Sequence, residues 1–315
     1  MPTKQGINMI TKTEFDAAAK DLGIGNTPLL PFEEDLPADV YFKYEAMNAS
    51  GSVKDRAALA MILDAEKSGL LHKGDTIVEA TSGNMGISLA YVGRAKGYNV
   101  LLAMPETMSV ERRQMLAGLG AQLVLTEGAL GMKGSIDYVE QISNQNGHVW
   151  LKQFSNSANA LAHYLSTGEE ICNQLDRVDI FVAGVGTGGT LIGAARKIKE
   201  HFPNCQIIAV EPASSPAISR GEKGPHKIQG IGAGFVTDIY DPSVVDEVQL
   251  VTDDQAMDEF KLLNKKLGYC CGISAAANIV VATRLAELPE NAGKNIVTLF
   301  PDSDDRYQSI LNACR

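Results

Sequence analysis

One stretch of the chain sets a lysine at the start of an apolar helix: Asn48-Ala49-Ser50-Gly51-Ser52-Val53-Lys54-Asp55-Arg56. Gly51 and the serines on either side of it allow the backbone to turn tightly. The run from Ala57 to Leu63 is apolar throughout, which predicts a buried helix rather than a solvated one. We therefore expect Lys54 in the first turn of a buried helix.

Two interpretations of Lys54 follow from these residues. An ammonium group buried without a partner tends to lose its proton, which is the state that a Schiff-base lysine needs. Alternatively, Lys54 is a surface lysine that flanks the helix, with its charge offset by Asp55. Other segments of the sequence are needed to distinguish these two interpretations.

Composition narrows the class of protein. A length of 315 residues suits two ordinary domains or one large α/β domain, and 21% charged residues argue against a disordered chain. The formal net charge of -10, without a basic stripe, argues against nucleic acid as a partner. The apolar runs are strand- or short-helix-sized, and the start of the chain lacks a signal peptide's apolar core, so we expect a cytoplasmic protein with no membrane partner.

The cysteines and histidines show no metal-ligand spacing, and we expect no metal site. An odd number of cysteines without a CxxC pair favours reduced thiols. We expect Cys270-Cys271 to serve in packing, with a redox role as the alternative. The five cysteines are Cys172, Cys205, Cys270, Cys271 and Cys314.

Strands and helices alternate along the chain, which indicates two α/β lobes with parallel sheets covered on both faces. Ligands of such sheets bind at the carboxyl ends of the strands. The first block has expected strands at 40–44, 76–80, 100–104, 122–125 and 149–151, and helices at 11–22, 87–96, 109–119 and 133–144 beside the Lys54 helix. The second has strands at 179–183, 206–210 and 296–300, helices at 165–175, 191–201, 253–267 and 274–287, and loops at 184–190 and 212–245.

A glycine-rich loop follows one of these strands: Gly184-Val185-Gly186-Thr187-Gly188-Gly189-Thr190. Its backbone N–H groups and two threonine hydroxyls would suit a phosphate at the start of a helix. The spacing also satisfies GxGxxG, with Glu211 at the end of the next strand, as in a dinucleotide fingerprint. A phosphate site, an NAD site and a simple tight turn are therefore the three alternatives.

A second loop, Thr81-Ser82-Gly83-Asn84-Met85-Gly86, follows another strand. Its hydroxyls and helix-start N–H groups would suit the carboxylate of an amino-acid substrate. The alternative is that Ser82 or Asn84 is only a helix N-cap.

In combination, these segments resemble the cysteine synthase (O-acetylserine sulfhydrylase) family. The Lys54 segment, both loops, Gly224–Phe235 and Gly272-Ile273-Ser274 occur in the family's order, and so does Met104–Arg113. The resemblance covers the chain from about Gly25 to Tyr307. It implies an α/β enzyme of PLP fold type II, similar to the tryptophan synthase β chain. It also implies a smaller, mobile substrate-binding domain at 47–157 and a larger cofactor-binding domain formed by 1–46 and 158–315.

The resemblance also implies roles for individual residues. Lys54 would hold pyridoxal 5'-phosphate (PLP) covalently and move the substrate Cα proton, Asn84 would contact the phenolic oxygen, and Ser274 would face the pyridine nitrogen. A neutral hydroxyl there makes the ring a modest electron sink, which fits β-elimination. Phosphate binding would fall to Gly186, Thr187, Gly188, Gly189 and Thr190. Substrate binding would fall to Thr81, Ser82, Asn84, Met85, Gln153 and, near the amino group, Gly230.

The implied reaction is replacement of acetate in O-acetyl-L-serine by sulfide to give L-cysteine, with a homodimer as the implied assembly. Met85 stands where the family usually has threonine, and Ser157 and Glu169-Glu170 lie where it usually has prolines. The alternatives are a serine- or cysteine-using β-replacement enzyme that forms cystathionine, lanthionine or hydrogen sulfide, and a weakly active relative that binds the C-terminal peptide of serine acetyltransferase. An NAD-linked enzyme would leave Lys54 and Ser274 unexplained.

Overall fold

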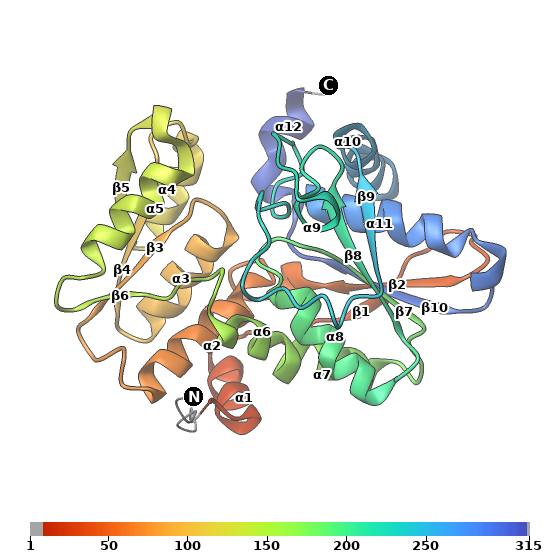
Figure 1. Ribbon diagram of the computed structural model, residues 1–315, viewed down its shortest axis with the longest axis horizontal. Helices are drawn as coiled ribbons and strands as arrows, with labels where there is room; N and C mark the ends of the chain where they lie inside the picture. Colours follow the sequence, from red (N-terminus) through yellow and green to blue (C-terminus); the bar gives the residue numbers. More distant parts are fainter. Residues whose placement is uncertain (1–8, 314–315) are drawn as a thin grey trace. The chain divides into compact units, whose positions relative to one another are not determined.

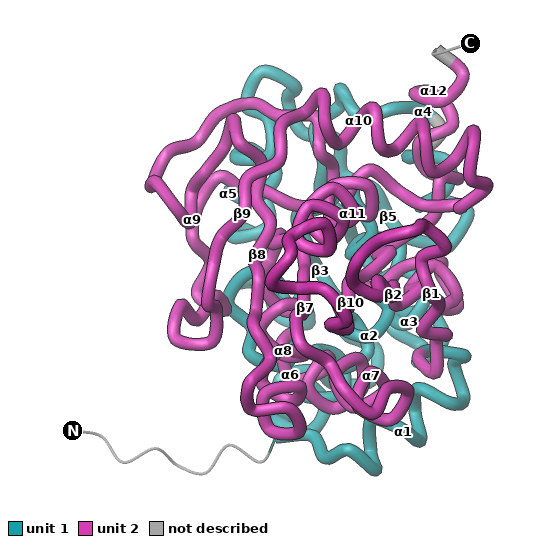
Figure 2. Tube along the Cα trace, turned by 90° about the vertical axis from the view of Figure 1, so that its right-hand side faces the viewer, with its two compact units in different colours: residues 1–24, 54–159 teal, residues 25–53, 160–315 magenta. Residues whose placement is uncertain are grey.

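The computed structural model describes residues 9–313, apart from the side chains of Glu111 and Ala313. The chain forms two compact units, which Figure 2 shows in different colours. Unit 1 comprises residues 1–24 and 54–159, and unit 2 comprises residues 25–53 and 160–315. Cys314 and the first eight residues, on which the expectation of a missing signal peptide partly rests, lie outside the described residues.

Unit 1 contains a four-stranded, fully parallel sheet in the order β5-β4-β3-β6. Helix α5 packs on one face through a core of Val78, Ala80, Ala103, Val139 and Ile142, and α3 contacts β3 and β4 (Figure 1). The strands are β3 (Thr76–Ala80), β4 (Asn99–Pro105), β5 (Gln122–Thr126) and β6 (His148–Trp150). The helices are α1 (Lys12–Asp21), α2 (Lys54–Lys67), α3 (Asn84–Ala95), α4 (Val110–Gly118) and α5 (Gly131–Ile142), with a short 3₁₀ turn at Gly128–Leu130.

Unit 2 contains a six-stranded sheet in the order β1-β2-β10-β7-β8-β9, in which only the β1–β2 pair is antiparallel. The expected α/β class with mostly parallel sheets is therefore confirmed. The strands are β1 (Leu29–Pro31), β2 (Asp39–Tyr44), β7 (Ile180–Gly184), β8 (Gln206–Pro212), β9 (Glu247–Val251) and β10 (Asn295–Phe300).

Two apolar clusters cover the two faces of the unit 2 sheet. One includes residues of α10 (Asp253–Leu262) and α11 (Ile273–Ala286), and the other includes residues of α7 (Glu169–Gln174) and α8 (Gly189–His201) (Figure 1). The remaining helices of this unit are α9 (Ala217–Arg220), α12 (Gln308–Ala313) and 3₁₀ turns at Glu45–Met47, Pro289–Asn291 and Asp304–Tyr307.

The expected helix at 165–175 was wrong at its start. Helical structure begins at α6 (Ser157–His163), passes through a π-helical turn at Tyr164–Gly168 and continues into α7. The Asn156 side chain accepts a hydrogen bond from the backbone N–H of Ala158 at 2.9 Å, which supports the helix start. Because most residues of α6 are buried, the segment has no amphipathic pattern that the sequence could reveal.

Other boundaries also differ from the expectation. Helix α3 begins at Asn84 rather than near 87, α8 begins at Gly189 within the expected loop, and α10 ends at Leu262 before a π-helical turn at Leu263–Leu267. Strands β1 and β9 and helix α12 were not predicted.

The π-helical turn and its surroundings fix α8 closely against the preceding helix. A Cβ atom on Gly168 would lie 2.8 Å from the Lys197 Cβ atom and 2.9 Å from the Ala194 carbonyl oxygen. A Cβ atom on Gly193 would overlap the carbonyl oxygen of Ala160. Both contacts therefore require glycine.

Within residues 9–313, no helix is long and apolar enough to cross a membrane. The same residues contain no cluster of His, Cys, Asp or Glu that could hold a metal ion.

Candidate functional site

Lys54 is the first residue of α2, as the sequence predicts. The turn before it contains Gly51 at a φ of +85°, a conformation that favours glycine. Lys54 is partly buried, and Asp55 beside it is completely buried with a 2.6 Å hydrogen bond from the Ser88 hydroxyl of α3. Asp55 therefore lies inside unit 1, and Lys54 begins a helix whose next residues are buried.

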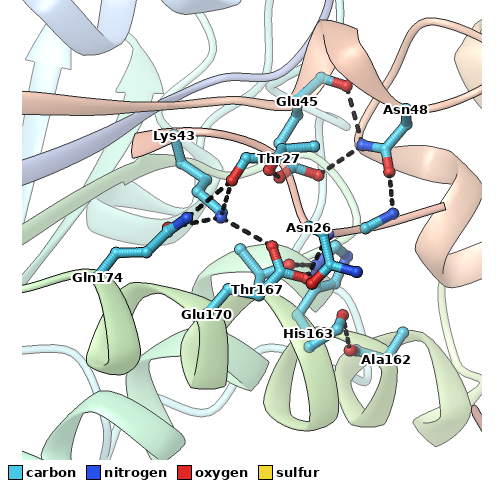
Figure 3. Close-up of polar contacts among 12 residues, drawn as sticks. Asn26, Thr27, Lys43, Glu45, Asn48, Ala162, His163, Thr167, Glu170 and Gln174 are labelled. Carbon is cyan, nitrogen blue, oxygen red and sulfur yellow. Dashed lines mark hydrogen bonds and ion pairs between the residues drawn. The ribbon is translucent and has the colours of Figure 1, made fainter. Parts of the chain in front are cut away.

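Buried polar side chains hold the residues that lead into this turn (Figure 3). The Asn48 side-chain amide donates to the Glu45 carboxylate at 2.8 Å and to the Glu45 carbonyl at 2.9 Å, and its oxygen accepts from the Gly25 N–H at 2.8 Å. The Thr27 hydroxyl donates to the other Glu45 oxygen at 2.7 Å. These hydrogen bonds therefore fix the position of Asn48, the first residue of the lysine segment, within unit 2.

The same network contains a buried ion pair between β2 and α7 (Figure 3). The Lys43 ammonium lies 2.7 Å from the Glu170 carboxylate and donates to the Gln174 amide oxygen at 2.8 Å and to the Thr27 carbonyl. The Lys43 side chain is fully buried, so removal of one partner would leave an uncompensated buried charge.

The loop after β3 presents the start of α3. Gly83 is the N-cap of α3 and makes no side-chain capping bond, so the interpretation of Ser82 or Asn84 as the N-cap is wrong. The Thr81 hydroxyl accepts the Gly83 N–H at 3.2 Å. The Gly86 N–H donates to the Gly83 carbonyl at 3.0 Å, but the earlier N–H groups of a helix generally lack intrahelical acceptors, so this helix start can bind an anion.

Met85 lies in the first turn of α3 with its side chain 2% exposed. Its thioether therefore packs inside unit 1, and its backbone N–H is the group left to serve a ligand. The next residue, Gly86, is also closely packed, because a Cβ there would lie 3.1 Å from a Leu102 methyl group and 3.2 Å from the Thr81 methyl group.

Gln153 follows β6 and is 6% exposed. Its carbonyl accepts the Asn159 amide at 2.9 Å, and its backbone N–H donates to Glu79 at 3.4 Å. Its own side-chain amide makes no hydrogen bond within residues 9–313, which leaves that amide available to a ligand.

The glycine-rich loop of unit 2 joins β7 to α8. Gly188 is the N-cap of α8 at a φ of +87° and makes no side-chain capping bond. A Cβ on Gly186 would lie 2.5 Å from the Gly230 carbonyl oxygen, and one on Gly184 would lie 2.7 Å from an Ile231 methyl group. Gly184 and Gly186 therefore pack against the 230–231 segment too closely for a side chain at either position.

The threonines of this loop have defined partners. The Thr187 hydroxyl accepts the Gly189 N–H at 3.4 Å, and the Thr187 carbonyl accepts the Thr237 hydroxyl at 2.8 Å. The Thr190 hydroxyl lies 3.2 Å from Nε2 of the fully buried His163. Nδ1 of His163 lies 2.9 Å from the Thr167 hydroxyl. No sequence pattern had pointed to His163, because it lies on α6, which the sequence did not predict.

Ser274 lies in the first turn of α11 and is 3% exposed. Among the described residues its hydroxyl has no hydrogen-bond partner. Gly230 has a φ of +96°, and a Cβ there would lie 3.5 Å from the Ser274 hydroxyl oxygen. Unit 2 thus brings Gly186, Gly230 and Ser274 together.

Glu211 decides against the dinucleotide interpretation. One carboxylate oxygen accepts the backbone N–H of Ile218 and the other accepts that of Ser219, each at 2.9 Å. The side chain is 2% exposed and supports the start of α9. Its oxygens are therefore engaged by the protein and are not presented to a ribose.

The sequence profile of the family described as "Pyridoxal-phosphate dependent enzyme" matches residues 20–302. The chain belongs to this family. The cysteine synthase of Staphylococcus aureus strain N315 is 46% identical over 291 residues, which cover 91% of this chain and 94% of that protein. The cysteine synthase of Haemophilus influenzae is 48% identical over 303 residues, which cover 93% of this chain and 96% of that protein.

Solved structures of this pyridoxal-phosphate family show the same fold. The crystal structure of cysteine synthase from Entamoeba histolytica matches with a TM-score of 0.88 and 39% identity, covering 98% of this chain and 92% of that one. A hydrogen sulfide-producing enzyme from Fusobacterium nucleatum matches with a TM-score of 0.86 and 42% identity, covering 91% of this chain and 96% of that one. The expected PLP fold type II and PLP dependence are confirmed.

The residues present in unit 2 fit the phosphate and ring of PLP. The glycine loop ends at the start of α8, and the N–H groups at a helix start suit a phosphate. The unpartnered Ser274 hydroxyl is a neutral group suited to a pyridine nitrogen. In unit 1, Lys54 is the residue whose amine would hold the cofactor.

Proposed function

We propose that the protein is a cysteine synthase that converts O-acetyl-L-serine and sulfide into L-cysteine and acetate. The observation that carries the proposal is Lys54 at the first turn of a buried helix, in a chain 46–48% identical to cysteine synthases over most of its length. The glycine loop and Ser274 supply the other groups that a PLP enzyme of this family needs.

PLP, when bound, supplies an electron sink that makes the substrate Cα proton acidic and allows a β-substituent to leave. The Lys54 amine is the group proposed to hold the cofactor and to take the Cα proton. Phosphate binding is assigned to Gly186–Thr190, with Thr190 oriented by His163. Asn84 is assigned to the phenolic oxygen and Ser274 to the pyridine nitrogen.

The substrate carboxylate is assigned to hydroxyl, amide and backbone donors of unit 1. They come from Thr81, Ser82, Asn84, the Met85 N–H and Gln153, and their hydrogen bonds to a carboxylate would be charge-assisted. Gly230 is assigned to the segment that senses the amino group. Closure of residues 81–86 over the carboxylate would exclude water from the reacting atoms.

Finer assignments follow from the same family. We propose a smaller, mobile substrate domain at 47–157, a larger cofactor domain formed by 1–46 and 158–315, a homodimer and a cytoplasmic location. The same carboxylate donors would also accept the C-terminal carboxylate of serine acetyltransferase, which we propose as a second ligand of residues 81–86.

A second candidate is production of hydrogen sulfide from cysteine by the same residues. It is favoured by the 42% identity to the Fusobacterium nucleatum enzyme and by Met85 in the substrate loop. Because the Met85 side chain is buried, its influence on substrate choice would act through packing of the loop and not through direct contact.

The test is the visible absorbance and turnover of the purified holoenzyme. We expect cysteine formation from O-acetyl-L-serine and sulfide, with no comparable turnover of L-serine or release of sulfide from L-cysteine. Lys54→Ala should abolish turnover and change the visible absorbance of the bound cofactor. The matched control is Lys73→Ala, an exposed lysine of the same unit, which should leave both unchanged. Preferential use of L-cysteine would favour the second candidate, and activity in Lys54→Ala would refute the assignment of Lys54.

A further inference from the structure

Glu79 is a buried carboxylate near the carboxyl end of β3, 2% exposed. One oxygen accepts the Trp150 indole N–H at 2.9 Å and the Ala80 N–H at 3.2 Å. The other accepts the Gln153 N–H at 3.4 Å. One side chain thus binds the ends of two neighbouring strands.

Both segments that Glu79 contacts lead into proposed substrate donors. Ala80 immediately precedes Thr81, and Gln153 is the residue whose amide makes no hydrogen bond within residues 9–313. Lys152 adopts a φ of +55°, which a residue with a side chain disfavours. The N–H of the next residue, Gln153, donates to the Glu79 carboxylate, which helps to offset the strain of that turn.

We propose that Glu79 is a positioning residue for substrate binding. Its carboxylate holds the 152–153 turn against the base of the 81–86 loop, so that the Gln153 amide and the Thr81 hydroxyl keep a fixed separation. This inference rests on the proposed function only in naming an amino-acid carboxylate as the ligand. Glu79 acts through the backbone of other residues and has no assigned contact with substrate.

The chemistry of the site favours a carboxylate over its neutral analogues, because every group that faces Glu79 is a donor. A glutamine there would turn its amide nitrogen toward one of these N–H groups and lose an acceptor. Within residues 9–313, Glu79 has no ion-pair partner, and the charged group of the adjoining turn, the Lys152 ammonium, lies over the Trp150 ring at 5.3 Å from its centroid. The hydrogen bonds alone therefore fix the orientation of the carboxylate.

The test compares Glu79→Gln with Glu211→Gln in the holoenzyme at pH 8. Glu211 is also a buried carboxylate that accepts two backbone N–H groups, but it supports α9 in unit 2. We expect Glu79→Gln to raise the KM for O-acetyl-L-serine about tenfold with kcat within about twofold, and to speed amide exchange at residues 150–154. The control should change neither the KM nor that exchange. Trp150→Phe, which removes one donor and keeps the carboxylate, should raise the KM by about threefold.

Each result bears on the role of Glu79. Faster amide exchange with an unchanged KM would show that Glu79 has only a structural role. A raised KM with unchanged amide exchange would refute the proposal that Glu79 holds the 152–153 turn in place. If Glu79→Gln does not fold, Trp150→Phe decides on the same two measurements. If the wild-type enzyme does not use O-acetyl-L-serine, the proposed function fails, while amide exchange and the affinity for L-cysteine still test Glu79.

Discussion

The loop of unit 2 and the loops of unit 1 build ligand-binding surfaces in different ways. In the unit 2 loop the proposed donors include backbone N–H groups beside tightly packed glycines, and a side chain on Gly186 would meet the Gly230 carbonyl oxygen. In unit 1 the donors include side chains, and a Cβ on Gly83 would meet no heavy atom within 4 Å. The unit 2 loop therefore tolerates no added atom at Gly186. The unit 1 loops, whose donors include side chains, can lose one donor and still bind a ligand.

The largest expected effect comes from Gly186→Ala. The added methyl group would lie 2.5 Å from the Gly230 carbonyl oxygen, so the loop must shift, and such overpacking costs about 1–3 kcal/mol. We expect PLP affinity to fall about tenfold to a hundredfold, measured by titration of the cofactor's visible absorbance.

Gly83→Ala is the matched control, because its methyl group enters open space at an ordinary φ of -97°. It should keep wild-type cofactor affinity and lose about 1 kcal/mol of stability, because glycine is preferred over alanine at the N-cap. If PLP affinity fell equally in Gly186→Ala and Gly83→Ala, the proposed difference between the two loops would be wrong.

Gln153→Ala should affect substrate binding and leave cofactor binding unchanged. Loss of one hydrogen bond to a carboxylate costs about 1.5–3 kcal/mol, so we expect the KM for O-acetyl-L-serine to rise at least tenfold while the cofactor absorbance stays unchanged. Steady-state kinetics with Gln145→Ala, an exposed glutamine of unit 1, as the control would check this. A loss of cofactor in Gln153→Ala would contradict the division of roles between the units.

The last prediction concerns the pH dependence of the free energy of unfolding. Burial raises the pKa of Glu79 to about 7 from an ordinary value of 4.5, against the opposing effect of its hydrogen bonds. The native state therefore holds a proton that the unfolded chain releases, and this contribution is complete below pH 4.5 and is lost as pH rises through about 7. The loss amounts to about 3 kcal/mol at most.

Thermal unfolding of the wild type and Glu79→Gln between pH 4.5 and pH 8.5 would measure it. We expect the Tm of the wild type to fall relative to the variant as pH rises. A constant difference would show that Glu79 keeps one charge state throughout. If the wild type is less stable than Glu79→Gln at pH 8 but binds substrate more tightly, the ionised Glu79 lowers stability while it positions the substrate donors.

The sequence predicted features that depend on neighbouring residues. The start of α2 at Lys54 followed from Gly51 and the apolar run, and both strand-to-helix loops followed from glycines and hydroxyls after apolar strands. The α/β class followed from alternation along the chain. These signals are local, so one sequence is enough to detect them.

Features that depend on pairing between distant residues were missed. Glu79 reads as an ordinary residue of a strand until β6 brings Trp150 to its carboxylate. His163 has no local signal, because its partner Thr190 lies 27 residues away on α8. Glu211 fitted a dinucleotide pattern by spacing, and only the backbone of α9 reveals what it binds.

The contacts of Gly168 and Gly193 with their neighbouring helices have a mechanical consequence. Gly193 lies near the start of α8, and Gly168 meets Ala194 and Lys197 further along it, so α8 is gripped at successive points along its length. A helix held in this way cannot tilt unless α6 and α7 move with it. The glycine loop at the start of α8 should therefore be rigid. A phosphate bound there would keep its position, and any motion during turnover would occur in other parts of the chain.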